Sequence, residues 1–304
     1  MRKVVHCASK VQGGEPGQKS KQPHRRNSSS PPVVRVFEPQ RGWIPLNWSE
    51  IWAGRALLLF LVWRDIKVRY KQTALGTSWA VLQPLATMVV FALFFGRFAG
   101  LAAKTGSAPY PLYVYAGLLP WMFFASSVGR SGNSLLGNAN LISKIYLPRL
   151  IIPVAAVGSG LLDTAIACIF LLALMAYYGV MPSWHLLLAP LFLLGTALAA
   201  MGVGTLLSAL TVSYRDFTYA VPFLLQLWMF ATPVIYPASI VPPHWQWIQI
   251  VNPLAGLIEG FRAAFLATPV DWPRGLGAVG ISAMLFLVGA FCFRRAERRF
   301  ADLI

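Results

Sequence analysis

Side chains that could bind a metal or carry out acid–base chemistry are few and scattered in this chain. The histidines and cysteines have no metal-ligand spacing, and no serine, histidine and aspartate set can be argued from the sequence. We therefore expect no catalytic residue, no metal and no cofactor in this chain. The residues concerned are His6, His24, His185, His244, Cys7, Cys168 and Cys292.

One segment imitates a nucleotide-binding loop. Residues 13–20 run Gly-Gly-Glu-Pro-Gly-Gln-Lys-Ser, but the motif needs glycine directly before the lysine, and that position is Gln18. No other segment of the sequence fits the motif, so we do not expect ATP to bind to this chain.

Asp163 is the only acidic residue deep within a long apolar stretch. An ionisable group inside a membrane costs roughly 2.5–3.5 kcal/mol on insertion scales, so it should face other helices or water. A proton or ion relay would need several such groups, and no Lys, Arg or His lies at a similar depth. We predict a structural role, with hydrogen bonds to Ser159 or Thr164 or across an interface, and keep a relay as the alternative.

The loop at residues 138–153 contains apolar groups that a simple connector does not need. Four of them fall on one face of a short helix that Pro148 would end, namely Leu141, Ile142, Ile145 and Tyr146. Periodicity leaves two interpretations open: a helix that docks in a groove of a partner, or a helix that lies back on the bilayer.

Two pairs of opposite charges stand out. Arg215 and Asp216 are adjacent in a tight turn, where they could form an ion pair or contact another element, or could simply be solvated. Glu259 and Arg262 have the i, i+3 spacing that allows a salt bridge on one helix. We expect a structural brace at Glu259 and Arg262, with a gate as the alternative.

Aromatic residues are abundant, with 11 Trp, 10 Tyr and 19 Phe. Ring faces can stack on the C–H faces of sugars, which would suit a channel for a polymer. Packing and lipid contact are the competing roles for each ring. The candidates for a channel are Phe91, Phe95, Tyr115, Trp121 and Phe124.

The composition indicates which elements must position these groups. The 304 residues are 57% hydrophobic and 12% charged, with a mean hydropathy of +0.59, whereas soluble domains have about 25% charged residues. A cytosolic enzyme and a disordered scaffold are therefore excluded. We predict an all-α integral membrane protein.

Charge-free stretches about 20 residues long predict six transmembrane helices. Gln83 and Pro84 are expected near the start of the first. Residues 237–266 are apolar but broken by Pro242-Pro243 and Asn252-Pro253, so we expect short re-entrant or interfacial helices on the outer side. The six predicted spans are about 80–100, 110–130, 150–178, 186–213, 217–236 and 275–294.

The distribution of positive charge predicts the orientation. If both termini are cytoplasmic, 22 of the 26 Lys and Arg residues lie on the cytoplasmic side, as the positive-inside rule requires. The net charge of +16 then reflects topology and a basic tail, which argues against nucleic-acid binding.

The N-terminal region divides in two. Residues 1–41 are rich in Ser, Pro, Gly and basic groups and are expected to be a disordered tail, while residues 42–304 form the membrane domain. Apolar and charged residues alternate over 48–71, which predicts an amphipathic helix in the cytoplasmic membrane surface. An anchor for anionic lipids is the simpler interpretation of this helix.

Several motifs occur in one order along residues 48–300. The chain thereby resembles the ABC-2 type permeases that export polysaccharides and polyol phosphates, such as O-antigen, capsule and teichoic acid. The matching motifs are Trp63–Lys71 with Thr73–Pro84, Gly117–Trp121, Ile145–Arg149, Tyr214–Phe217, and Asn252–Leu254 followed by Gly260–Arg262.

The resemblance implies a subunit in the cytoplasmic (inner) membrane that pairs with a second copy of itself and with two cytoplasmic ATP-binding subunits, which hold ATP and Mg. Its cargo would be a glycan or lipid-linked glycan, guided by the channel aromatics. Residues 237–266, including Asn252, Pro253, Glu259 and Arg262, would cap the channel. The gate helix would include Arg64, Asp65, Lys67, Arg69 and Tyr70. The ATPase-coupling helix would comprise Leu141, Ile142, Ser143, Lys144, Ile145, Tyr146, Leu147, Pro148 and Arg149.

Three other functions are weighed against polysaccharide export. An ABC-2 permease for a small molecule or lipid would share the fold. An ion-coupled secondary transporter would need coupling-ion ligands beyond Asp163, and a membrane glycosyl-transferring enzyme would need more catalytic groups than Arg215 and Asp216 supply. Dependence of transport on ATP and the effect of Asp163→Asn would discriminate among them.

Overall fold

The computed structural model describes residues 52–71, 76–104, 108–142, 144 and 148–297. These residues form helices, turns and bends and no β-strand. The predicted tail at 1–41 and the start of the predicted amphipathic helix, residues 48–51, lie outside the described residues, as do Ser143, Ile145, Tyr146 and Leu147.

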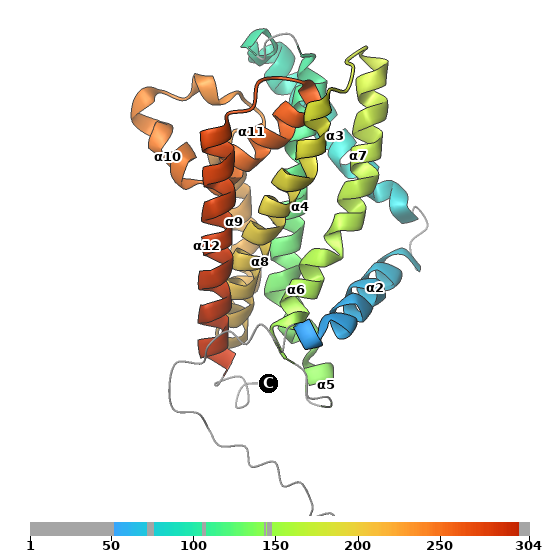
Figure 1. Cartoon of the computed structure of the whole chain (residues 1–304), viewed down its shortest axis with the longest axis vertical. Helices are drawn as coiled ribbons and strands as arrows, with labels where there is room; N and C mark the ends of the chain where they lie inside the picture. The colour runs from blue at the N-terminus through green and yellow to red at the C-terminus, as the bar shows by residue number, and fades with distance from the viewer. Residues whose placement is uncertain (1–51, 72–75, 105–107, 143, 145–147, 298–304) are drawn as a thin grey trace, which may run out of the picture. The chain divides into compact units, whose positions relative to one another are not determined.

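The described helices follow one another along most of the chain (Figure 1). Their bounds are α2 (Arg55–Lys71), α3 (Trp79–Phe91) with its π-helical continuation (Ala92–Phe98), α4 (Tyr110–Gly137), α5 (Ala139–Ile142), α6 (Ile151–Gly158), α7 (Gly160–Tyr177), α8 (Ala189–Ser213), α9 (Phe217–Ala231), α10 (Gln246–Val251), α11 (Pro253–Leu266) and α12 (Trp272–Glu297).

Five helical stretches among the described residues are long and apolar enough to cross a membrane. They are Gly76–Phe98, Tyr110–Gly137, Ile151–Tyr177, Trp184–Ser213 and Trp272–Glu297. They correspond to five of the six predicted spans. Pro84 lies inside the first stretch rather than at its start.

The fifth predicted span, 217–236, is shorter than expected. Its helix α9 has 15 residues, or about 22 Å of length, and ends at Ala231. Pro233 explains this end, because a proline disfavours the helical conformation of the preceding residue. Thr232 is accordingly extended, with φ −105° and ψ 138°.

The core of the bundle is built around α4, the most enclosed of the long helices. A second, smaller cluster joins Leu61 of α2, Leu150 and Ile151 at the start of α6, and Phe293 of α12. Helices α8 and α12 approach each other at Gly202 of α8 and Gly289 of α12. A Cβ on Gly202 would lie 2.5 Å from the carbonyl carbon of Leu285, so this close approach requires glycine.

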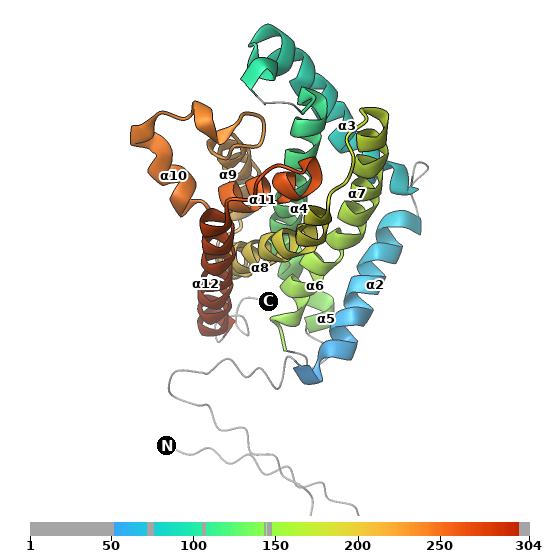
Figure 2. The ribbon, with the colours of Figure 1, turned by 45° about the horizontal axis from the view of Figure 1, so that its top comes forward.

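The two ends of the bundle carry different elements. Helices α10 and α11 lie together at one end, and α5 lies at the other, near the start of α2 (Figures 1 and 2). The prediction of short helices within 237–266 is confirmed, and nearly every residue of α11 is buried. Helix α2 runs obliquely from the α5 end along α6 and α7 (Figure 2).

Candidate functional site

A carboxylate on α7 holds the C-terminal end of α2. Arg69 forms an ion pair with Asp163 through Nη1 and Oδ2, and the Tyr70 hydroxyl donates a hydrogen bond to Oδ1 of the same side chain. Arg69 also donates from Nη2 to Ser159 Oγ over 3.2 Å. Both carboxylate oxygens of Asp163 are therefore bonded to side chains of α2. This contact joins the predicted gate helix to the third long span.

The partners of Asp163 decide among the alternatives predicted from the sequence. We expected hydrogen bonds to Ser159 or Thr164 or across an interface, and the interface is what the structure shows: the carboxylate binds Arg69 and Tyr70 of α2, and Ser159 takes part only through Arg69. Thr164 donates to the carbonyl oxygen of Gly160 instead. Burial, followed by the bond to Asp163, raises the pKa of Tyr70 to about 12, so this phenol stays a hydrogen-bond donor at neutral pH.

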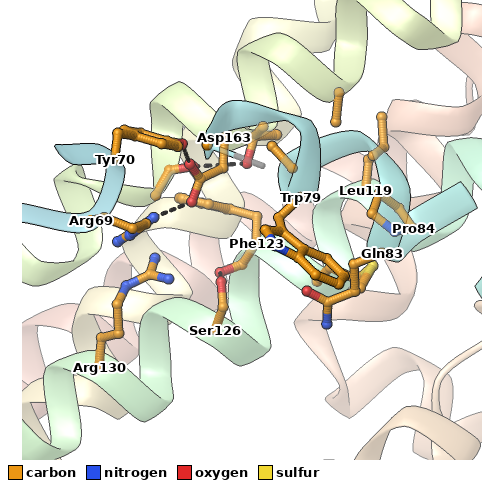
Figure 3. Close-up of a pocket in the computed structure, with 16 residues that line it drawn as sticks. Arg69, Tyr70, Trp79, Gln83, Pro84, Leu119, Phe123, Ser126, Arg130 and Asp163 are labelled. Atoms are coloured by element: carbon orange, nitrogen blue, oxygen red, sulfur yellow. Dashed lines mark hydrogen bonds and ion pairs between the residues drawn. The ribbon is translucent and has the colours of Figure 1, made fainter. Parts of the chain in front are cut away.

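A cavity of about 280 Å³ lies beside this contact, between α2, α3, α4 and α7 (Figure 3). Its polar lining comes from Arg69, Tyr70, Gln83, Ser126, Arg130, Asp163 and Thr164, and its apolar wall includes Trp79, Pro84, Leu119 and Phe123. Figure 3 shows Arg69, Tyr70 and Arg130 approaching Asp163 from two different helices. Two guanidinium groups and one carboxylate therefore share one cavity.

Glycines make room for these side chains. A Cβ on Gly160 would collide with the Arg130 guanidinium, and a Cβ on Gly158 would lie 3.0 Å from a methyl group of Val62. The two glycines flank Ser159, the single residue between α6 and α7. The junction of these helices is thus the place where both α2 and Arg130 can approach closely.

Arg64 connects the other half of α2 to the predicted coupling segment. Its Nη2 donates to Asp65 Oδ1 over 2.8 Å and to Asn138 Oδ1 over 2.9 Å. Asn138 is the C-cap of α4, directly before α5. Lys67 lies over the Trp63 ring, 5.3 Å from its centre. Helix α2 therefore contacts the start of the coupling segment through Arg64 and the cavity through Arg69 and Tyr70.

The described part of the predicted coupling helix is short. Helix α5 has four residues, and Leu141 and Ile142 are half-buried against the second hydrophobic cluster of the chain itself. Lys144 is exposed, and Arg149 donates from Nη1 to the carbonyl oxygen of Glu297 over 3.2 Å. Two of the apolar residues predicted to face a partner thus pack within this chain, while Lys144 is exposed.

Arg215 and Asp216 lie exposed in the turn between α8 and α9. Within the described ranges, neither side chain comes within 4.0 Å of an opposite charge, so of the three alternatives the structure favours the solvated turn over an ion pair. The backbone carbonyl of Asp216 accepts the N–H groups of Tyr219 and Ala220 instead. The first hydrogen bonds of α9 are therefore made by the backbone of this turn and not by its charged side chains.

At the opposite end of the bundle, Asn252 organises the start of α11. Its Oδ1 accepts from the Leu254 backbone N–H and from Trp228 Nε1, each over 3.2 Å, and its Nδ2 donates to Thr232 Oγ1 over 2.8 Å. Pro253 occupies the first helical position, where its missing N–H costs nothing. The Asn-Pro pair thus caps α11 and fixes it to the end of α9.

Arg262 is the most deeply buried cation of the described residues, with 3% of its surface exposed. Its Nε and Nη1 donate to the Tyr113 carbonyl oxygen and hydroxyl over 3.1 and 2.7 Å, and its Nη2 donates to the carbonyl oxygens of Pro233 and Val234 over 3.2 and 2.8 Å. The guanidinium also lies 3.8 Å from the centre of the Tyr113 ring. Burial lowers the pKa of Arg262, and these acceptors compensate the charge.

The partner of Arg262 therefore differs from the one predicted. Glu259 pairs with Arg274 of α12 over 3.5 Å rather than with Arg262, and burial raises the pKa of Glu259. The local i, i+3 spacing does not decide the pairing, because a guanidinium with five donors is better satisfied by several carbonyl oxygens. Arg262 acts as a brace between α11, α4 and the segment after α9.

Three of the predicted channel aromatics are core residues. Tyr115 and Phe124 are fully buried, and Trp121 is nearly so. Phe124 packs edge-on against Trp228 with ring centres 5.2 Å apart, and Tyr115 lies 5.6 Å from Phe170. The channel role predicted for Tyr115, Trp121 and Phe124 is corrected to packing, because neighbouring helices of the same chain cover these rings. Phe91 and Phe95 are half-buried against the same core.

Comparison with known proteins identifies the family. The model of the ABC-2 type transporter family matches residues 56–266, which include all of α2 but its first residue, the residues that line the cavity, the α5 segment and α11. This chain is a member of the ABC-2 type transporter family. The site described above lies within the residues that the family model matches. The predicted all-α membrane fold is confirmed, with five candidate spans and a shorter apolar helix among the described residues.

Similarity extends over most of the chain in several curated proteins. The chain is 30% identical over 258 residues to "O-antigen export system permease protein RfbA" of Myxococcus xanthus, which covers 84% of this chain and 98% of that protein. It is 29% identical over 249 residues to a protein of the same name from Klebsiella pneumoniae, covering 82% and 95%. It is 25% identical over 248 residues to "Polysialic acid transport protein KpsM" of Escherichia coli, covering 79% and 92%.

Proposed function

We propose that this chain is the membrane permease of an ATP-driven exporter that moves a polysaccharide or lipid-linked glycan from the cytoplasm across the inner membrane. The observation that carries the proposal is the similarity over 98% of the length of a protein named as an O-antigen export permease. A transport protein named for polysialic acid is similar over 79% of this chain. The ABC-2 fold alone is compatible with many cargoes. The names of these relatives are what supports a polysaccharide as the cargo.

The proposed assembly contains two copies of this chain and two separate cytoplasmic ATP-binding subunits, which hold ATP and Mg. The 22 of 26 Lys and Arg residues that fall on one side of the predicted spans support a cytoplasmic position for both termini and for the α5 segment. The exposed Lys144 follows α5 and is available to a partner at that end. The remaining contact residues of the coupling segment would be Ser143, Ile145, Tyr146 and Leu147.

The contacts of α2 suggest how a movement at the α5 segment reaches the interior. Asn138 at that segment holds Arg64, and one and a half turns later on α2 Arg69 and Tyr70 hold Asp163. A displacement of α5 by a closing pair of ATP-binding subunits would pull on Asn138 and move α2 along α6. The proposed role of α2 as a gate follows, because α2 forms one wall of the cavity.

A photo-crosslinking experiment tests this assembly. A photoreactive residue replaces Lys144 in the full-length chain, and the matched control carries it at Met181, which is 82% exposed between α7 and α8 at the other end of the bundle. We expect Lys144 to crosslink to a protein the size of one ATP-binding subunit and Met181 not to do so. Export of a surface glycan should stop when ATP hydrolysis by that partner is blocked. Labelling of lipid alone at both positions, with export independent of ATP, would contradict the proposal.

A further inference from the structure

The cavity beside α2 carries more positive charge than its own carboxylate balances. Arg69 and Arg130 line it together with a single acid, Asp163, which leaves a formal excess of one positive charge. The side chains of Arg69 and Asp163 keep 29% and 27% of their surface exposed, so a ligand can reach their ion pair. Gln83, Ser126 and Thr164 add neutral polar groups to the same lining.

Arg130 is the cation without a counter-charge in this cavity. Its Nη2 donates to Ser127 Oγ over 3.3 Å and its Nε donates to the Ala156 carbonyl oxygen over 3.5 Å, and both acceptors are neutral. Across the described residues, no carboxylate oxygen lies within 4.0 Å of it. Two of its five N–H donors are thus used, and the remaining donors are available to an anion.

The size and chemistry of the cavity restrict the ligand. Its volume of about 280 Å³ lies just below the roughly 300–1,000 Å³ of typical small-molecule sites, which suits a small polar group better than a sugar chain. Guanidinium groups present planar pairs of donors that match the oxygens of phosphate and carboxylate. Two such groups around one space favour an anion with oxygens on several sides.

We infer that this cavity binds a phosphate group between Arg69 and Arg130, and that Asp163 occupies Arg69 while the cavity is empty of phosphate. An arriving phosphate, with more charge and more acceptor oxygens than one carboxylate, displaces Asp163 from Arg69 and also neutralises Arg130. Asp163 then keeps its bond to Tyr70, so α2 is held by one contact in place of two. The inference rests on the proposed function only for the biological source of the phosphate, which a lipid headgroup or a free anion could supply.

In this exchange Asp163 competes with the phosphate and Arg130 binds it. Substitutions at the two positions should therefore change the affinity for phosphate in opposite directions. Full-length protein, purified with the subunits that accompany it, is placed in phosphatidylcholine nanodiscs. Binding of spin-labelled phosphatidic acid, which exposes a phosphomonoester, is compared with binding of the matched diacylglycerol, which has no phosphate. The variants are Asp163→Asn, Arg130→Gln and Arg130→Lys, and the matched control is Arg97→Gln, which removes an exposed cation outside the cavity.

We expect Asp163→Asn to bind phosphatidic acid several-fold more tightly than the wild type and Arg130→Gln to bind at least tenfold more weakly. Arg130→Lys should stay within about threefold of the wild type, as should Arg97→Gln, and diacylglycerol should bind equally to all variants. Displacement by millimolar inorganic phosphate would support a free anion as the source, and its failure to displace would support a lipid headgroup.

Two results would overturn the inference. The first is equal binding by Arg130→Gln and Arg97→Gln, and the second is weaker binding by a folded Asp163→Asn, which would make Asp163 a supporting structural group. Because the assay needs neither a glycan nor ATP, its outcome is separate from that of the Lys144 crosslink. A chain that crosslinks to an ATP-binding subunit but shows no preference for phosphatidic acid keeps the proposed function and loses only this site.

Discussion

Two tyrosines that lie two positions apart on α4, Tyr113 and Tyr115, should differ in their response to loss of the hydroxyl group. Tyr113 accepts a hydrogen bond from the buried Arg262 over 2.7 Å. The buried Tyr115 hydroxyl has no hydrogen-bond partner among the described residues. Each Tyr→Phe change removes one oxygen atom and keeps the ring, so the pair isolates the hydrogen bond from packing.

The magnitudes follow from these contacts. Tyr113→Phe removes a hydrogen bond to a charged group and leaves a buried N–H without its acceptor, which costs about 1.5–3 kcal/mol. The ring remains 3.8 Å from the guanidinium, so the cation–π contact is retained. Tyr115→Phe removes an unsatisfied hydroxyl whose burial costs about 1–3 kcal/mol, so it should leave the protein unchanged or more stable.

Thermal unfolding in detergent, followed by intrinsic tryptophan fluorescence, measures this difference. At about 2–4 °C per kcal/mol, a combined difference of about 1.5–6 kcal/mol means that Tyr113→Phe should melt roughly 3–24 °C below Tyr115→Phe. Tyr177→Phe is the matched control, because that side chain is 82% exposed, and it should melt with the wild type. Equal melting temperatures for Tyr113→Phe and Tyr115→Phe would refute the assignment of Arg262 as a brace.

Three further predictions address other contacts. Gly117→Ala should destabilise the protein by about 1–3 kcal/mol in the same melting assay, because the added Cβ would collide with the Arg262 guanidinium and lie 2.8 Å from the Val234 carbonyl oxygen. Gly129→Ala is the control and should not destabilise the protein, because the space at its Cβ position is open. Asn252→Ala should cost about 1–3 kcal/mol, since the cap of α11 and the bonds to Trp228 and Thr232 are lost together, and an unaltered melting temperature would contradict the capping role. Folding raises the pKa of Tyr70 from 10.0 to about 12, so the bond from Tyr70 to Asp163 stabilises the folded state fully below pH 10 and is lost as the pH rises toward 12. The difference in melting temperature between the wild type and Tyr70→Phe should therefore shrink between about pH 10 and 12, and a constant difference would refute the assignment.

Local sequence patterns predicted the elements well. Charge-free stretches located the long helices, and Asn252-Pro253 correctly indicated a break followed by a short helix, since both features act within a few residues of the chain. The predicted span 217–236 ends five residues after α9 does, because Pro233 already disfavours helix in the residue before it.

The contacts of the site were less predictable, because their partners are distant in sequence. Arg69 and Asp163 are 94 positions apart, and Arg262 and Tyr113 are 149 apart. Local spacing instead suggested Glu259 for Arg262 and near neighbours for Asp163. Arg130 stands at the end of a charge-free stretch, and this position gives no signal of a cavity. The close approach at Gly160, which admits its guanidinium, is visible only in three dimensions.

The hydrogen bonds of Arg262 also set an order for biogenesis. Each of its acceptors, on Tyr113, Pro233 and Val234, precedes Arg262 in the chain. During synthesis from the N-terminus, α4 and the segment after α9 therefore leave the ribosome before α11 does. An arginine among apolar residues would otherwise meet lipid without compensation, at a cost of roughly 2.5–3.5 kcal/mol on insertion scales. Insertion of α11 can thus proceed directly onto acceptors that are already in place, with no period in which its charge waits for a later helix.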